Sequence, residues 1–333
     1  MNEASPALVA DIGGTNVRFA LARRAAGGVS LDAVRAYAVA EFDSLIAAAA
    51  HYLQACDARP GHAVLAAAGP VRGGEVRITN NPWVISAAHV AATLGLDAVR
   101  IVNDFAAMSA ALPALEPAAL RPIGAGGVPA IDLAVPGVFG IMGPGTGLGV
   151  GLLVVHDGRA LILETEGGHV SFAPTSAEQA AVRRVLAARF GRVSNERLVC
   201  GAGLLNMYQA LCELAARTPA LPTPEAVSAA AAAGQDAEAG RAARMFAEIL
   251  GAAAGDLVLT AGAWDGVYLP GGMVRPLLPW LEGGALRAGF ENKGRFAAAV
   301  ARVPLVAVLH ENPGLLGAAT LALDARIDTV RRS

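Results

Sequence analysis

The stretch Leu8–Leu21 reads LVADIGGTNVRFAL, and the interpretation of the whole chain starts from it. Apolar residues flank a Gly-Gly-Thr-Asn turn, which predicts a β-hairpin. Adjacent glycines accept positive φ and carry no Cβ, so backbone N–H groups in such a turn can converge on an anion. Asp11 enters the turn, and its carboxylate would repel a phosphate unless a cation lay between them. The turn therefore points to phosphate with Mg²⁺, although a plain hairpin with a capping Asp explains the same residues.

The composition is typical of a chain with a large core. Of the 333 residues, 54% are hydrophobic and 16% are charged, so we expect an ordered protein long enough for two domains. The net charge is −2 and no basic run stands out, which argues against binding to nucleic acid. Lys293 is the only lysine, which excludes the Walker phosphate loop and the ATP-binding lysine of protein kinases.

The cysteines and the hydropathy pattern favour a reducing compartment. Cys56, Cys200 and Cys212 form no CxxC pair, so neither a zinc site nor a disulfide framework is indicated. The N-terminal residues contain no basic segment followed by an apolar core, and we expect no signal peptide. The uncharged stretch Leu133–Val155 is long enough for a membrane span, but prolines and glycines divide it into two short strands. We therefore predict a cytoplasmic protein without a membrane partner.

The glycine-rich turn of residues 8–21 has a second version in the chain. Phe139–Val155, FGIMGPGTGLGVGLLVV, again places a glycine turn with a threonine between two apolar strands. Between the two turns, strands are followed by strand–helix alternation, which predicts an α/β fold with a mixed sheet. Farther along, Ala177–Phe190 is expected to be a helix, and Thr223 is expected to cap another. The repeat suggests two related domains that hold one nucleotide from both sides of a cleft.

Asn103 and Asp104 lie where a short apolar strand is expected to end and a helix to begin. α/β folds place ligands at the carboxyl ends of their strands. An alcohol that attacks phosphate loses its proton late, and a carboxylate within hydrogen-bond reach can accept it. We therefore predict that Asp104 is a general base and that Asn103 orients the substrate. The alternative is that one of the two only caps the helix.

A second polar group, EGGH at residues 166–169, places a carboxylate and an imidazole three residues apart. Its two glycines disfavour a helix, so we expect a loop that approaches a small ligand closely. The pair suits the hydroxyls of a polyol, although a structural loop histidine is the alternative. Glu196 taken alone is typical of a surface or capping residue. Gly271 and Gly272 follow a predicted strand, where they form either a plain turn or a close approach for an adenine ring.

Taken together, these stretches resemble bacterial glucokinases of the hexokinase-like type, in the sugar kinase, Hsp70 and actin superfamily. The resemblance runs from about Leu8 to about Ala325, with the motifs in the family's order and at roughly its spacing. Each motif is a weak signal, whereas the ordered set is specific. The segments that carry it are DIGGTNVRFAL, IVNDFAAMSAAL, GPGTGLGVGLL, EGGHVSFAP, VSNERLVCGAGLLNMY, YLPGGMV, FENKGRF and HENPGLLGAA.

The resemblance implies ATP-dependent phosphorylation of the 6-hydroxyl of glucose, with Asp104 as the base. Asp11 would act through Mg²⁺, with water in between. The residues implied to bind the sugar are Asn103, Asp104, Glu166, His169 and Glu196. Those implied to lie around ATP are Gly13, Gly14, Thr15, Asn16, Gly145, Thr146, Gly147, Gly271 and Gly272.

The resemblance also implies a fold and an assembly, and two other functions compete with the one it implies. We expect two ribonuclease-H-like α/β domains with mixed sheets flanked by helices, and an active-site cleft between them. Residues 1–106 with 311–333 would form the small domain and residues 107–310 the large one. A homodimer is typical of such enzymes, and the absence of a cysteine cluster after His169 argues against zinc. A kinase for another hexose and a sugar-sensing regulator without catalysis are the alternatives.

Overall fold

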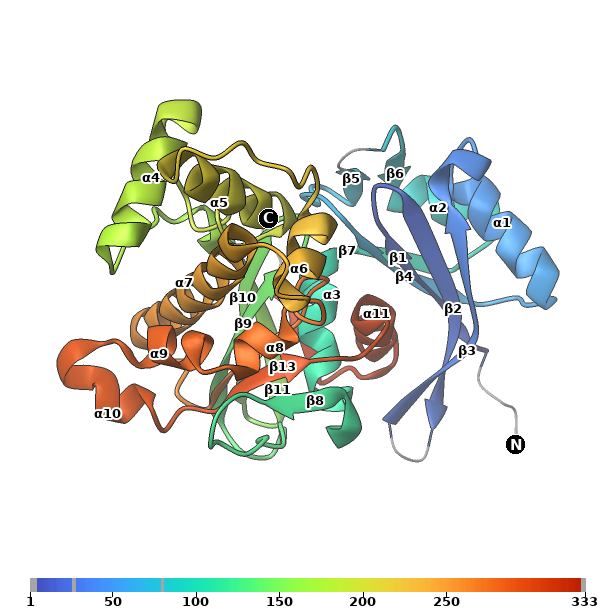
Figure 1. The fold of residues 1–333 in the computed structure, drawn as a ribbon. Helices are drawn as coiled ribbons and strands as arrows, with labels where there is room; N and C mark the ends of the chain where they lie inside the picture. The colour runs from blue at the N-terminus through green and yellow to red at the C-terminus, as the bar shows by residue number, and fades with distance from the viewer. Residues whose placement is uncertain (1–4, 26–27, 79–80, 331–333) are drawn as a thin grey trace.

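The computed structural model describes residues 5–25, 28–78 and 81–330. Two large β-sheets flanked by helices lie side by side and form two lobes (Figure 1). A third, two-stranded sheet pairs β5 (Glu75–Arg77) with β6 (Val84–Ser86). The first lobe is built from the N-terminal part of the chain, and the second from most of the rest. Helix α11 (Pro313–Leu323), near the end of the chain, packs back onto the first sheet. The two lobes are therefore not simple halves of the sequence.

The first sheet has five strands, and the hairpin predicted at the N-terminus forms its centre. β1 pairs with β2 and β2 with β3 in antiparallel fashion, whereas β4 and β7 run parallel to β1. Successive side chains of β1 point to opposite faces of the sheet, as in any β-strand. On one face, Leu8 and Ile12 pack with α1 (Leu45–Cys56) and α2 (Ala87–Leu94). On the other face, Val9 packs with α11. In spatial order the strands are β3 (Gly28–Ala38), β2 (Asn16–Ala25), β1 (Ala7–Ile12), β4 (His62–Ala67) and β7 (Ala98–Asn103).

The second sheet repeats this arrangement around the second glycine turn. β9, β10 and β11 form two successive antiparallel hairpins, and β12 and β13 continue the sheet parallel to β9. The same order of five strands therefore occurs in both sheets, as the internal repeat in the sequence predicts. In spatial order the strands are β14 (Ile327–Thr329), β11 (Arg159–Thr165), β10 (Leu148–His156), β9 (Gly137–Pro144), β12 (Gly266–Leu269), β13 (Leu305–Val308) and β8 (Leu120–Pro122).

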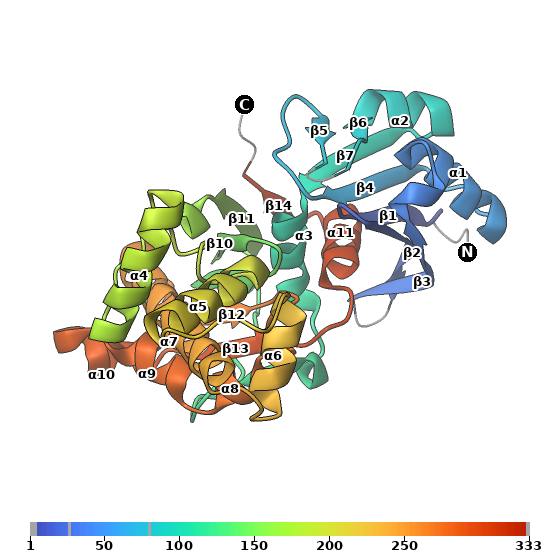
Figure 2. The same cartoon turned by 45° about the horizontal axis from the view of Figure 1, so that its top comes forward.

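Helices cover the outer face of the second sheet (Figure 2). The longest helix, α7, contacts α9 so closely that a Cβ on Gly251 would lie 1.9 Å from the Leu286 carbonyl oxygen. Leu133–Val155 includes the β9–β10 hairpin, and in the part of the chain described no helix is long and apolar enough to cross a membrane. The helices of this lobe are α4 (Ala177–Phe190), α5 (Gly201–Leu214), α6 (Pro224–Ala232), α7 (Ala237–Ala261), α8 (Leu278–Glu282), α9 (Ala285–Glu291) and α10 (Ala297–Val300).

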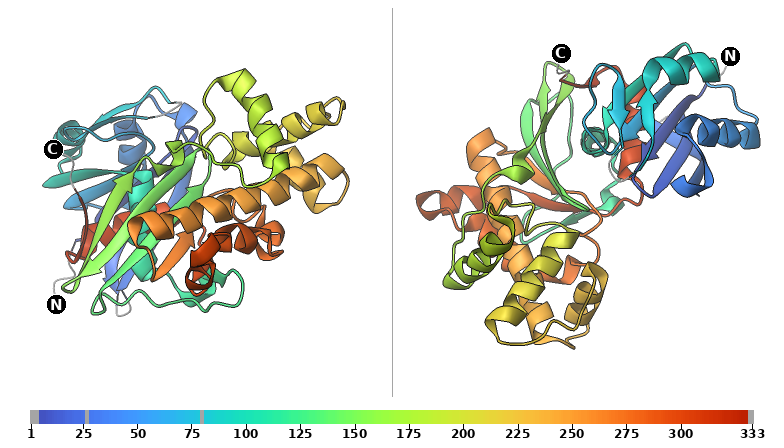
Figure 3. Two further views of the ribbon diagram at one scale, coloured as in Figure 1. Left: turned by 90° about the vertical axis from the view of Figure 1, so that its left-hand side faces the viewer. Right: turned by 90° about the horizontal axis from the view of Figure 1, so that it is seen from above.

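Two helices, α3 (Asp104–Ala111) and α11 (Pro313–Leu323), lie between the sheets (Figures 2 and 3). Their backbones touch, because a Cβ on Gly317 would lie only 1.6 Å from the carbonyl oxygen of Ala107. Buried residues of both sheets pack against this pair in one continuous apolar cluster. The architecture is therefore the predicted α/β fold of two sheets with flanking helices, and the central helix pair joins them.

Candidate active site

Asn103 ends β7 and caps α3. Its side-chain Oδ1 accepts hydrogen bonds from the backbone N–H groups of Phe105 at 2.9 Å and Ala106 at 3.2 Å. Its Nδ2 donates to the carbonyl oxygen of Gly69 at 3.3 Å. The capping interpretation of the sequence is therefore correct for Asn103, because an N-cap side chain satisfies N–H groups that the helix leaves without partners. A contact from the same residue to substrate stays a prediction.

Asp104 is the first residue of α3, and it is held by the protein around it. Its Oδ1 accepts a hydrogen bond from the backbone N–H of Phe105 at 2.9 Å. Burial raises the pKa of the Asp104 carboxyl to about 6, with further contributions from the negative charges of Asp11 and Glu164. A carboxylate with a pKa near neutral pH is still largely ionised there and binds a proton more tightly than an ordinary carboxylate. It therefore accepts a proton more effectively.

Asp11 lies near the end of β1, opposite Arg18 on β2. Burial raises the pKa of its carboxyl, while the Arg18 guanidinium, with Nη1 3.8 Å from Oδ2, acts in the other direction. The start of α11 closes over this carboxyl, since a Cβ on Gly314 would lie 2.9 Å from Cγ of Asp11. Gly314 is the first of two glycines in the HENPGLLGAA segment, and its lack of a side chain makes room for Asp11.

The first glycine turn is held by its own backbone and by two residues from other segments. The N–H of Gly13 donates to the carbonyl oxygen of Asn16 at 3.0 Å, and Asn81 Nδ2 donates to the carbonyl oxygen of Gly13 at 3.3 Å. The N–H of Val39 donates to the carbonyl oxygen of Thr15 at 2.9 Å. Thr15 and Asn16 are exposed at the tip of the turn, where a ligand can reach them.

The second glycine turn is held by a hydrogen bond of its own and by two other segments of the chain. The N–H of Gly145 donates to the carbonyl oxygen of Gly147 at 2.8 Å, and the Gly145 carbonyl oxygen accepts from the N–H of Gly201 at 2.9 Å. Gly271 has φ +125°, and a Cβ there would lie 2.4 Å from the carbonyl oxygen of Pro144. Only glycine fits a backbone that combines this conformation with so close an approach. Gly271 is therefore placed beside the second turn.

The EGGH loop packs on the same turn. A Cβ on Gly168 would lie 2.1 Å from the Leu148 carbonyl oxygen, and the Gly168 carbonyl oxygen accepts from the N–H of Glu196 at 2.9 Å. Glu196 Oε2 in turn accepts from the N–H of Leu148 at 2.9 Å. Glu196, which looked unremarkable in the sequence, thus links the loop to the turn.

Two of the residues predicted to bind the sugar, Glu166 and Glu196, lie within ion-pair distance of a third, His169. His169 Nε2 is 3.9 Å from Glu166 Oε2, and His169 Nδ1 is 3.8 Å from Glu196 Oε1. The side chains of Glu166 and His169 are 78% and 59% exposed, and that of Glu196 is 31% exposed. This cluster offers solvent-facing donors and acceptors of the kind that bind sugar hydroxyls.

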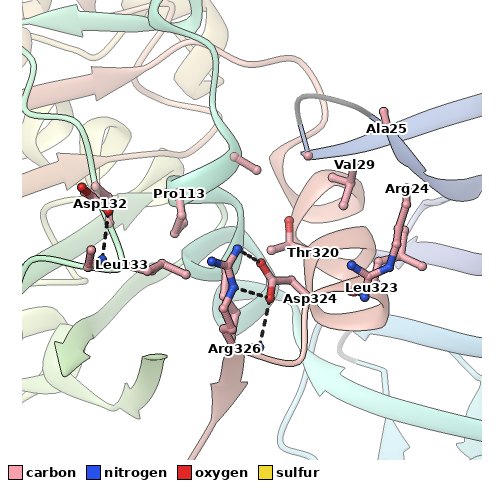
Figure 4. Close-up of a pocket in the computed structure, with 15 residues that line it drawn as sticks. Arg24, Ala25, Val29, Pro113, Asp132, Leu133, Thr320, Leu323, Asp324 and Arg326 are labelled. Atoms are coloured by element: carbon pink, nitrogen blue, oxygen red, sulfur yellow. Dashed lines mark hydrogen bonds and ion pairs between the residues drawn. The ribbon is translucent and has the colours of Figure 1, made fainter. Parts of the chain in front are cut away.

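A separate cavity of about 480 Å³ lies at the other end of β2 (Figure 4). Arg326 donates to both oxygens of Asp324, at 2.7 to 3.0 Å, and Arg24 donates to the Leu323 carbonyl oxygen. Asp132 accepts from the N–H of Ala134 at 2.9 Å. Because none of the residues predicted for the active site lines this cavity, it is separate from the candidate active site. A second cavity of about 610 Å³ has Asn103 and Glu164 among its lining residues.

Comparison with known proteins identifies the family. Residues 8–325 match the family model described as Glucokinase. The chain belongs to the glucokinase family. It is 49% identical to the glucokinase of Stenotrophomonas maltophilia strain K279a over 324 residues, which covers 97% of this chain and 96% of the relative. It is also 49% identical to the glucokinase of Xanthomonas campestris pv. campestris strain 8004 over 321 residues, with 96% of each covered.

Solved structures of glucokinases share the fold. The crystal structure of a glucokinase from an Antarctic psychrotroph matches with a TM-score of 0.85 and 32% identity, covering 95% of this chain and 98% of that one. A ROK family glucokinase from Streptomyces griseus in complex with glucose and AMPPNP matches with a TM-score of 0.62 and 18% identity, covering 95% and 99%. The family and fold class inferred from the sequence are therefore confirmed, and so is the assignment to the ATP-dependent glucose kinases.

Proposed function

We propose that this protein transfers the γ-phosphoryl group of ATP to the 6-hydroxyl of glucose, and that Asp104 is the general base. The observation that carries the proposal is the half-buried Asp104 carboxyl at the junction of β7 and α3, whose pKa of about 6 suits proton transfer near neutral pH. Its first step is alignment of the 6-hydroxyl by Asp104. The carboxylate then accepts the hydroxyl proton as the oxygen attacks phosphorus, which yields glucose 6-phosphate and ADP.

The sugar pocket in this proposal combines the end of β7 with the EGGH loop. Glu166, His169 and Glu196 accept from or donate to the hydroxyls of the ring, and Asn103 adds an amide beside the base. The 3.8 and 3.9 Å spacings around His169 support this grouping, because they keep the three side chains within reach of one small ligand. This set of donors and acceptors suits a polyhydroxylated acceptor, and the names of the relatives favour glucose.

ATP in this proposal lies between the two glycine turns. The residues assigned to it are Gly13, Gly14, Thr15, Asn16, Gly145, Thr146, Gly147, Gly271 and Gly272. The negative charge of Asp11 contributes to the raised pKa of Asp104, so a divalent cation beside these two acidic groups fits their charge. We assign Mg²⁺ to the phosphates of ATP and, through water, to Asp11, because Mg²⁺ usually keeps several waters and binds through one or two carboxylates together with substrate phosphates. Bound Mg²⁺ would supply neutralising charge for the transferred group.

We further propose that the lobes close on the sugar. Closure would exclude water that otherwise competes with glucose for the phosphoryl group. The moving units would follow the predicted domains, residues 1–106 with 311–333 and residues 107–310, with two differences. Strand β14 would move with the second sheet, where it pairs with β11, and α3, which crosses residue 106, would move as one helix. A homodimer and a cytoplasmic location complete the proposal.

The test is a coupled kinase assay with a panel of hexoses and phosphoryl donors. We expect ADP release with ATP and glucose, and a fall in kcat of about 10²–10⁴-fold for Asp104→Ala, with glucose binding only weakened. Wild-type-like turnover in that variant would remove Asp104 from the role. A much higher kcat/KM for mannose, fructose or N-acetylglucosamine than for glucose would reassign the substrate.

A further inference from the structure

The aromatic ring of Phe105, the residue after Asp104, rests in a hollow on the second sheet. Phe105 is 9% exposed, and its backbone N–H is the group that both Asn103 and Asp104 bind. The hollow is formed by Gly143 on β9 with two glycines of β10. Side chains on these glycines would point into the space that the Phe105 ring fills.

The glycine positions define the hollow. Gly143 and Gly149 are paired across β9 and β10, and Gly151 lies two residues farther along β10 on the same face. A Cβ on Gly149 would lie 2.2 Å from Cδ2 of Phe105, one on Gly143 would lie 2.6 Å from Cε2, and one on Gly151 would lie 3.4 Å from Cε1. Real contacts of carbon atoms are about 3.5–4.0 Å, so the ring fits only because the first two positions lack side chains.

The contact with Phe105 explains glycines of the GPGTGLGVGLL segment that a phosphate-binding turn does not explain. Gly145 and Gly147 lie within the turn, whereas Gly143, Gly149 and Gly151 lie in the flanking strands. The strand glycines touch a ring that is one residue away from the carboxyl proposed as the base. The ring therefore connects α3, which lies between the two sheets, to the strands that carry the second turn.

We propose that Phe105 is a positioning residue, and that its seat on Gly143, Gly149 and Gly151 fixes Asp104 relative to the second glycine turn. This inference rests on the proposed role of Asp104. The ring itself touches neither sugar nor nucleotide in this account. It sets the position of the Asp104 carboxylate when the 6-hydroxyl and the γ-phosphoryl group meet. A displacement of a reacting group by about 1 Å can lower the rate by about 10²-fold.

The test is a double-mutant cycle of Phe105→Ala and Gly149→Ala. Each single variant is expected to lower kcat by about 10- to 100-fold while the KM for glucose changes by less than about 3-fold, since the EGGH loop is untouched. Because the methyl group of one variant enters space that the other vacates, the double variant is expected to be no slower than the slower single variant. Losses in kcat that simply multiply would overturn the proposal.

The matched control is Gly140→Ala, on the opposite face of β9, where the new Cβ would lie 2.9 Å from the Leu257 side chain. It disturbs the same sheet without touching Phe105, so its kcat is expected to stay within about 3-fold of the wild-type value. Each variant is assayed below its own unfolding temperature, and Phe105→Leu replaces Phe105→Ala if the latter does not fold.

The outcomes separate this inference from the proposed function. If Asp104→Asn is inactive while Phe105→Ala and Gly149→Ala keep wild-type kcat, only the positioning role is wrong. If Asp104→Asn keeps wild-type turnover, the assignment of the base is wrong, and the positioning role fails with it. A fall in kcat for Gly140→Ala as large as that for Gly149→Ala would also reject the inference, since the effect would then belong to the sheet as a whole.

Discussion

Replacement of Asp104 by Asn is expected to abolish turnover and at the same time to stabilise the fold. The isosteric amide keeps an oxygen that can accept from the Phe105 N–H, but it carries no charge to bury. The pKa of Asp104 is about 6 in the folded protein, against an ordinary value of 3.8, so ionising it costs more in the folded state than in the unfolded one. At about 1.36 kcal/mol per pH unit this difference corresponds to roughly 3 kcal/mol, an upper limit because the side chain partly faces solvent.

The sign of the pH dependence follows from the raised pKa. Below pH 3.8 both states bind the proton, and the carboxyl then costs no stability. As the pH rises from 3.8 through about 6, the folded wild-type protein must release a proton that it holds more tightly than the unfolded chain does, so its relative stability falls. The Asn variant does not titrate, and its advantage should grow over this window and stay constant above pH 7.

The assay is urea unfolding of both proteins at pH 4, 6 and 8 without ligands, together with kcat over the same range. We expect the Asn variant to be more stable by about 1–3 kcal/mol at pH 8 and nearly equal at pH 4. Wild-type kcat should fall as the pH drops through about 6, because the protonated carboxyl no longer accepts a proton. An Asn variant that is less stable than the wild type at pH 8, or an advantage independent of pH, would refute the reasoning.

Three further predictions concern the rest of the site. Gly168→Ala should lower kcat/KM for glucose by about 100-fold, because its Cβ would lie 2.1 Å from the Leu148 carbonyl oxygen and the EGGH loop would have to move. His169→Ala should raise the KM for glucose by about 10- to 100-fold with a smaller change in kcat, as loss of a hydrogen bond to substrate does, and steady-state kinetics measure both. Gly314→Ala should raise the KM for MgATP by about 10-fold, since its Cβ would lie 2.9 Å from Cγ of Asp11; this is read from ATP titrations at saturating glucose.

Gly127→Ala is the control for both glycine variants. Gly127 is exposed, and a Cβ there would meet no atom within 4 Å, so no kinetic constant should change. An unaltered KM for glucose in His169→Ala would make His169 a structural residue of the loop. Wild-type kinetics in Gly168→Ala or Gly314→Ala would mean that the backbone at these positions adjusts without moving the residues we assign to the ligands.

Local rules placed much of the secondary structure correctly. The helix expected at Ala177–Phe190 has those bounds, and Thr223 caps α6 as predicted, with its side chain accepting from the N–H of Ala226. Both follow from capping residues and from apolar spacing, which depend on neighbours in sequence. The alternatives at Asn103 could not be separated in this way, because capping a helix and binding a substrate require the same residue at the same strand end.

The sequence by itself determined the two glycine hairpins, the strand ends with their acidic residues, and the family. Each depends on residues within about a dozen positions of one another, or on the order in which motifs follow along the chain. Only the tertiary structure decided why Gly168, Gly271 and Gly314 must be glycines, and why the pKa of Asp104 is raised. Those properties arise where segments far apart in sequence come within van der Waals contact, and no local pattern records which backbone atom or charge a residue will meet there.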